Sequence, residues 1–157
     1  MTSSSSTKFV SNPPRVTVML ASSISIATAA WSVLTWTATD GSDYEAMRSG
    51  TRLVVPAAGR YVVAGQVSFG ASTTGHRYVQ VRKNSGGSPS GGIPVVQQRV
   101  PAAAGGNATL VNAAGDAPAL ADGDYLELFA WQNSGGALAL NSGPGETVLS
   151  VRWVALD

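Results

Sequence analysis

The 157-residue sequence contains no cysteine, a single histidine and few charged side chains, which make up 12% of the residues. Without cysteine, the chain forms neither disulfide bonds nor thiolate metal sites. The one histidine, His76, leaves too few ligands for a zinc site, and its place in the predicted turn Gly75-His76-Arg77 favours a solvated loop residue over the base of a hydrolase triad. The formal net charge of +1 gives no electrostatic signature of a nucleic acid or an anionic membrane. We therefore expect no catalytic residues, no metal, no cofactor, and neither nucleic acid nor membrane as a partner.

Long apolar runs are also missing, since no segment reaches the ~18 apolar residues that a membrane-spanning helix needs. A mildly apolar stretch that ends in Ala27-Thr28-Ala29 is similar to a secretory signal. Serines interrupt this stretch and Pro13-Pro14 stands at its start, so we assign it to the folded protein instead.

Acidic residues gather at predicted turns. Asp40 and Asp43 flank a Gly-Ser pair, and Asp122 and Asp124 flank Gly123. Aspartate is favoured at turns because its side chain bonds to nearby backbone groups. A calcium site, which needs six or more oxygen ligands, and a pair of glycosidase carboxylates are the less favoured alternatives.

What the sequence does contain is a series of short apolar segments, separated roughly every 8–12 residues by turn residues. No window shows a 3.6-residue apolar period with helix caps. This pattern predicts an all-β fold, an antiparallel jelly-roll sandwich of about ten strands, whose last strand lies inside a sheet beside the first strands. The expected strands cover residues 16–20, 24–27, 31–36, 52–55, 61–69, 78–83, 95–100, 109–113, 125–132, 138–140 and 147–154.

The segment 125–132 has two different faces, because side chains alternate along a strand. Its aliphatic face suits the core of the sandwich. Its aromatic face then points outward, where a large apolar patch indicates an interaction site. The alternative is that the aromatic face forms the core. The aliphatic face carries Leu126, Leu128 and Ala130, and the other face carries Tyr125, Glu127, Phe129 and Trp131.

Several segments in the right order resemble the C1q/TNF-like jelly rolls. Residues 52–63 (RLVVPAAGRYVV) resemble the family's apolar–x–Pro–x–x–Gly–x–Tyr signature. Residues 76–84 are similar to its next strand, and residues 120–128 (LADGDYLEL) to its Leu–x–x–Gly–Asp–x–apolar–x–Leu segment. Residues 147–154 look like its closing strand, with Leu149 and Trp153 where the family usually has phenylalanine.

The resemblance implies a domain over residues 15–157 that forms a homotrimer, with the strand after Gly-Asp near the threefold axis. Tyr125, Phe129, Trp131 and, more weakly, Tyr61 are then the candidate trimer contacts.

Phage proteins similar to this domain carry a short polar arm and decorate capsids as trimers. The lead interpretation is accordingly a phage head decoration (minor capsid) protein, made in the host cytoplasm and placed on the outer capsid surface of the virion. Residues 1–14 are expected to form its extended arm. Its expected partner is the major capsid protein, and no small-molecule ligand is expected.

The alternatives are a receptor- or glycan-binding head of a phage tail fibre, a polysaccharide depolymerase and a bacterial C1q-like surface domain. Within the arm, the candidate capsid contacts are Lys8, Phe9, Val10, Pro13 and Pro14.

Overall fold

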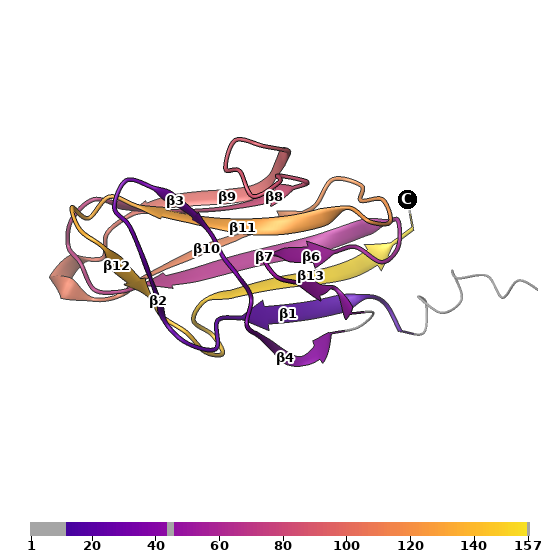
Figure 1. The fold of residues 1–157 in the computed structure, drawn as a ribbon, viewed down its shortest axis with the longest axis horizontal. Helices are drawn as coiled ribbons and strands as arrows, with labels where there is room; N and C mark the ends of the chain where they lie inside the picture. The colour runs from indigo at the N-terminus through magenta and orange to yellow at the C-terminus, as the bar shows by residue number, and fades with distance from the viewer. Residues whose placement is uncertain (1–11, 44–45, 157) are drawn as a thin grey trace, which may run out of the picture.

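Two antiparallel β-sheets pack face to face in the computed structural model, which describes residues 12–43 and 46–156 (Figure 1). This confirms the predicted all-β sandwich. The described residues contain thirteen strands, more than the expected number of about ten. The strands are β1 (Arg15–Met19), β2 (Ile24–Ile26), β3 (Trp31–Val33), β4 (Ala38–Asp43), β5 (Arg48–Ser49), β6 (Arg52–Val54), β7 (Arg60–Phe69), β8 (His76–Lys83), β9 (Ile93–Pro101), β10 (Thr109–Asp116), β11 (Tyr125–Gln132), β12 (Leu138–Leu140) and β13 (Val148–Ala155).

The first sheet has seven strands built around β7. One edge of β7 pairs with β10, and the other pairs with β13 and then with β12. The sheet continues from β13 to β1 and β4, and from β12 to β2. The last strand therefore lies between β7 and β1, which confirms the predicted pairing of the two ends of the domain.

The second sheet has six strands built around β11. One edge of β11 pairs with β8, which in turn pairs with β9. Along its other edge, β11 pairs with β6 near its start and with β3 near its end, and β5 pairs with β6. The aromatic strand of the sequence analysis thus occupies the middle of this sheet.

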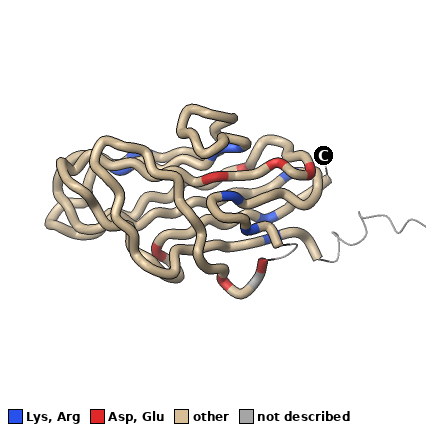
Figure 2. The backbone as a smooth tube through the Cα atoms, viewed as in Figure 1, with Lys and Arg blue, Asp and Glu red and all other residues tan. Residues whose placement is uncertain are grey.

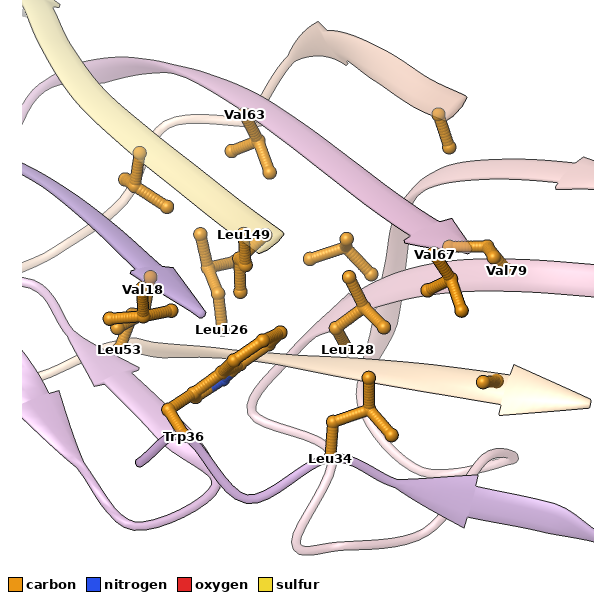
Figure 3. Packing of buried hydrophobic residues seen from close by; sticks show 14 of the residues in the cluster. Val18, Leu34, Trp36, Leu53, Val63, Val67, Val79, Leu126, Leu128 and Leu149 are labelled. Carbon is orange, nitrogen blue, oxygen red and sulfur yellow. The ribbon is translucent and has the colours of Figure 1, made fainter. Parts of the chain in front are cut away.

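The core lies between the two sheets and is mainly aliphatic. Leu126, Leu128 and Ala130 are each fully buried in it, so the predicted aliphatic face of β11 is confirmed as the core face. Trp36, from the connection between β3 and β4, packs among Leu126, Leu128 and Leu34 (Figure 3). Burying one such side chain stabilises the fold by about 1.5–3 kcal/mol.

The predicted turn at Asp40–Asp43 is wrong, because these residues belong to β4. The pairing of β4 with β1 shifts register between Val16 and Val18, where Gly41 adopts a φ of 68°. These residues therefore form a β-bulge. A bulge, like many turns, needs a residue with positive φ, and glycine adopts this conformation most easily. Asp43 accepts hydrogen bonds from the backbone N–H groups of Met47 and Arg48, so its carboxylate holds the chain beyond the bulge.

Candidate functional site

Three aromatic side chains form a row across the outward face of the second sheet. Trp131 on β11 lies directly opposite Trp31 on β3 and Tyr78 on β8. Residues opposite each other on neighbouring strands project from the same face. We call Trp31, Trp131 and Tyr78 the aromatic row.

The rings of the aromatic row touch one another. The ring centroids of Trp31 and Tyr78 are 4.8 Å apart with planes tilted by 58°, and those of Trp31 and Trp131 are 6.4 Å apart at 42°. Tilted ring pairs at these separations are mutually favourable. All three side chains are half-buried, so the row offers solvent one continuous aromatic surface.

Polar side chains of the edge strand β9 extend this row. Arg99 lies opposite Tyr78, and the Tyr78 hydroxyl donates a hydrogen bond of 2.9 Å to Oε1 of Gln97. Both Arg99 and Gln97 are exposed. Because neighbouring strands are about 4.8 Å apart, the line from Trp31 to Arg99 crosses about 14 Å of the sheet.

Farther along β11, the same outward face is covered by the loop Asn84–Gly92, which connects β8 and β9. This loop stands above these strands in Figure 1. Gln80 donates a hydrogen bond to the Pro89 carbonyl, and the Arg82 guanidinium donates to the carbonyls of Gly91 and Gly92. The loop is therefore bound to the sheet by several hydrogen bonds.

The carboxylate of Glu127 is the main anchor of this loop and is only 1% exposed. Its Oε2 accepts hydrogen bonds from the Ser85 hydroxyl at 2.5 Å and the Gly87 N–H at 2.8 Å, and its Oε1 accepts one from Thr51 at 2.6 Å. Burial alone would raise the pKa of Glu127, but these hydrogen bonds and the nearby charge of Arg52 hold it below its ordinary value. Glu127 therefore stays ionised inside the protein.

A second carboxylate, Asp124, fixes the start of the same loop. It forms an ion pair with Lys83 at 2.6 Å and accepts hydrogen bonds of 2.7 Å from both the Asn84 amide and the Ala121 N–H. Partial burial would raise the pKa of Asp124, but these contacts lower it. The carboxylate thus has the structural turn role expected from the sequence.

The four predicted trimer contacts occupy different environments. Tyr125 and Trp131 are half-buried on the outward face of the second sheet, and the Arg52 guanidinium lies 4.1 Å from the centre of the Tyr125 ring. Phe129 is only 1% exposed, which corrects its predicted outward exposure: it is flanked by Val33 and Gln80 on the neighbouring strands. Its side chain has almost no surface left for another subunit.

Tyr61 is also corrected, because its ring is 1% exposed within the core. Its hydroxyl donates a hydrogen bond to the Ala57 carbonyl at 2.8 Å. Burial and the charge of Asp122 raise the pKa of Tyr61 to about 12, although the Ala57 bond opposes this shift. Tyr61 is thus a core residue of the subunit.

The predicted arm lies mostly outside the described residues, which include neither Lys8, Phe9 nor Val10. Pro13 is half-buried and Pro14 is buried. The Pro14 carbonyl accepts a hydrogen bond of 2.8 Å from the Trp153 N–H on β13. Pro14 is therefore packed on the domain itself, which corrects its assignment as a free arm contact.

The outward face of the first sheet is lined mainly by short uncharged side chains. Across its middle run Ala114 on β10, Ala64 on β7, Ser150 on β13 and Thr17 on β1, each opposite the next. Leu110 near one end of β10 is 49% exposed. Strands β1 and β13 both contribute to this surface.

A pocket of about 460 Å³ adjoins this face at the end of the first sheet. It is lined by the first residues of β7, the segment 116–119 and Val154-Ala155 of β13. Val154 is 52% exposed, so the pocket and the outward face share an apolar rim.

Within residues 12–43 and 46–156, no three or more His, Cys, Asp or Glu side chains are grouped so that they could hold a metal ion. The same residues include no helix long and apolar enough to cross a membrane. His76 begins β8, and its N–H donates to Oδ1 of Asn133. Arg77 is fully buried, and its guanidinium donates to the carbonyls of Ser72, Thr74 and His76.

Sequence reasoning found Trp131 but missed its two partners. Trp31 and Tyr78 both lie in segments that were expected to be strands, but neither segment has the conspicuous aromatic alternation of residues 125–132. Their joint position depends on the register of β3 and β8 against β11, which no local pattern in the sequence specifies.

The chain resembles solved TNF-like jelly rolls in three dimensions. It matches a structure of Eiger TNF from S. frugiperda with a TM-score of 0.64 and 11% identity, over 92% of this chain and 94% of the other. It matches murine APRIL at pH 5.0 with a TM-score of 0.63 and 17% identity, over 89% of this chain and 98% of the other. No protein-family model and no curated protein matches the sequence. At these identities, the similarity establishes the fold class, a TNF-like jelly roll, and nothing more specific.

Proposed function

We propose that this chain is a structural virion protein that forms a homotrimer and binds the major capsid protein on the outside of a phage head. The TNF-like fold supports the trimer in this proposal. The role on a phage head extends the resemblance drawn from the sequence motifs. The observation that carries the assembly step is the outward face of the first sheet, which offers a broad surface suited to contact with other copies of the chain.

This face favours self-association for two physical reasons. Its central row of Ala114, Ala64, Ser150 and Thr17 lets another subunit approach closely, because the side chains are short. Removing the exposed apolar side chains of Leu110 and Val154 from water would lower the free energy of the assembled state. We therefore place the trimer contact on the first sheet, whereas the sequence had suggested β11.

Charges at one end of this face suit a head-to-tail arrangement of subunits. Asp116 on β10 and Arg152 on β13 lie in the same cross-strand row, with Val62 between them. A closed ring joins two different patches of neighbouring subunits. In such a ring, the acidic edge of one subunit can meet the basic part of the next.

Size-exclusion chromatography with light scattering tests the contact. We expect Ala114→Glu to convert a trimer into monomers, because it places a charge in the middle of the contact. Trp131→Glu tests the sequence-based alternative at β11. A trimer that survives Ala114→Glu but dissociates in Trp131→Glu would move the contact to the second sheet, and a monomeric parent protein would refute trimerisation altogether.

The residues before Pro13 provide the capsid attachment in this proposal, since this segment is rich in serine and threonine, whose hydroxyls can bond to another protein. Deleting residues 1–12 should lower the occupancy of the protein on purified phage heads. The number of subunits in the oligomer and the β-sheet circular dichroism should stay unchanged. Equal occupancy with and without the segment would contradict the role of the arm.

A receptor- or glycan-binding head of a tail fibre is the second candidate function. The aromatic row favours it, because an exposed aromatic surface beside polar side chains is typical of a ligand site. Binding of the purified trimer to a glycan array, together with no affinity for undecorated heads, would replace the decoration proposal with this one.

A further inference from the structure

We propose that the aromatic row and the adjoining side chains of Gln97 and Arg99 bind an acidic saccharide, a chain of sugar rings that carry carboxylates. The inference rests on the second candidate function above and deepens it by naming the site and the ligand class. It does not depend on capsid attachment, and the proposed trimer contact on the first sheet leaves this face open.

The aromatic surface matches the apolar faces of sugar rings. A pyranose ring has flat faces of C–H groups and a rim of hydroxyls, so it can stack on an aromatic ring while its rim stays hydrogen-bonded. The rings of Trp31, Trp131 and Tyr78 provide a continuous surface of this kind. Flat aromatic side chains also lose little conformational entropy on binding.

The polar groups at the end of the row match the rim and the charge of such a ligand. Gln97 has a side-chain amide that is exposed beside the Tyr78 hydroxyl. Arg99, opposite Tyr78, presents a planar guanidinium that can pair with a carboxylate through two parallel hydrogen bonds. Stacking and charge pairing are thus available along one line of about 14 Å.

The charge of the second sheet favours an anionic ligand. Among the residues that the structure describes, its strands contain one carboxylate, Glu127, which is 1% exposed and already bonded to Ser85, Thr51 and Gly87. Figure 2 shows how the charged residues are distributed along the backbone. The basic residues in the strands of this sheet are Arg48, Arg52, Arg77, Arg82, Lys83 and Arg99.

Most of these cations are engaged within the protein, which favours a saccharide over a single-stranded nucleic acid. Arg52 pairs with Glu127, Arg82 donates to loop carbonyls, Lys83 pairs with Asp124 and Arg77 is fully buried. At the aromatic row itself, Arg99 provides the exposed charge. Nucleic-acid binding depends on neutralising several phosphates along the backbone, and one guanidinium cannot supply this. An acidic sugar needs only one such pair at a time.

Strand pairing holds two of the three rings in place before any ligand arrives. Trp131 and Tyr78 lie on adjacent strands of the central part of the sheet, and Phe129, two residues before Trp131, is buried beside them. A surface that is already formed loses less conformational entropy when a ligand binds, so less of the binding free energy is offset.

Isothermal titration calorimetry on the full chain tests the proposal. The probes are oligosaccharides of galacturonate, of mannuronate and guluronate, of hyaluronate and of polysialate, with the methyl ester of each as its uncharged match and a thymidine oligonucleotide as the nucleic-acid probe. We expect at least one acidic oligosaccharide to bind, with about tenfold weaker binding of its uncharged match and a loss of affinity at high salt.

Matched variants locate the site. Arg99→Gln and Trp131→Ala should each weaken binding of the acidic oligosaccharide about tenfold or more, whereas Arg60→Gln, which removes an exposed arginine from the first sheet, should leave binding unchanged. Light scattering on the same samples reports the trimer, so a failure of assembly is distinguished from a failure of binding.

Three results would overturn the inference: binding to none of the acidic oligosaccharides, equal binding of the methyl-esterified match, or binding of the oligonucleotide alone. Equal loss of affinity in Arg99→Gln and Arg60→Gln would overturn the assignment to the second sheet.

Discussion

At the residue scale, the buried polar side chains of this protein hold loops in place. The Arg77 guanidinium donates to the carbonyls of Ser72 and Thr74 between β7 and β8 and to that of His76 at the start of β8, and burial lowers its pKa from the ordinary arginine value. Glu127 does the same for the loop between β8 and β9. Buried polar groups persist because leaving a partner unbonded costs about 1–3 kcal/mol.

Gly59 gives a prediction at the same scale. Its φ is 150°, its backbone pairs with Leu120, and a Cβ atom there would collide with Nε1 of Trp153 and the carbonyl of Ala155. We expect Gly59→Ala to lower the free energy of unfolding by about 2–3 kcal/mol, measured by urea denaturation.

The matched control for this substitution is Gly136→Ala. Gly136 has an ordinary φ, and no heavy atom lies within 4 Å of the position that an added Cβ atom would occupy, so a change there should be nearly neutral. Equal losses of stability in the two variants would contradict the steric explanation.

At the element scale, the loop Asn84–Gly92 depends on two ionised carboxylates, Glu127 and Asp124. The pKa of each is lower in the folded protein than in the unfolded chain, where values near 4 are ordinary. Such a group stabilises the fold fully above its unfolded pKa, and this stabilisation is lost as the pH falls through its folded pKa. Acid should therefore loosen this loop first.

We predict that the urea midpoint is lower at pH 3 than at pH 7, with the loss beginning roughly below pH 4. Backbone amides of residues 85–91 should lose protection from hydrogen exchange over this same acidic interval. In Glu127→Gln, the midpoint should be lower at pH 7, since hydrogen bonds to the ionised group are lost, and the further fall on acidification should be smaller.

Glu146→Gln is the control, because Glu146 is half-buried and its carboxylate forms none of the loop contacts. The Glu146→Gln variant should keep the loop contacts of Glu127 and Asp124, so its residues 85–91 should lose protection at the same pH as in the parent protein. A Glu127→Gln variant that loses as much stability on acidification as the parent would show that Glu127 does not anchor the loop.

At the scale of the whole molecule, the two outward faces differ in kind. The first sheet presents short, mostly uncharged side chains, whereas the second presents aromatic rings and the edge-strand residues Gln97 and Arg99. This difference lets one face serve self-association and the other bind a ligand in the functions proposed above.

Self-association predicts that stability depends on protein concentration. If the folded chain is a trimer and the unfolded chain is not, mass action raises the unfolding temperature as the protein becomes more concentrated. We expect this rise in differential scanning calorimetry over about a hundredfold range of concentration, and no such rise for Ala114→Glu. A parent protein whose unfolding temperature stays constant over this range would contradict the trimer.

Much of the fold follows from local patterns. Turn residues at short intervals and alternating apolar residues predicted most of the strands, and the alternation within residues 125–132 identified the core face of β11 correctly. The same patterns failed at β4, because a glycine with positive φ occurs in a bulge as well as in a turn.

The candidate site was less predictable, because burial depends on residues distant in sequence. Phe129 and Trp131 lie two residues apart and therefore on the same face of β11, yet Phe129 is buried and Trp131 is half-buried. Their neighbours on β3 and β8, which differ at the two positions, decide this. Tyr61 is buried for the same kind of reason, since its side chain points between the sheets.

The sequence by itself determined the all-β class, the positions of most strands and which side of β11 faces the core, because alternation and turn chemistry are local properties of the chain. Only the tertiary structure brought Trp31, Trp131 and Tyr78 together, placed the loop Asn84–Gly92 over Glu127 and, among the described residues, left Ala114 exposed on the outward face of the first sheet. These features depend on strand order and register, which are set by long-range pairing between segments that the local pattern leaves unspecified.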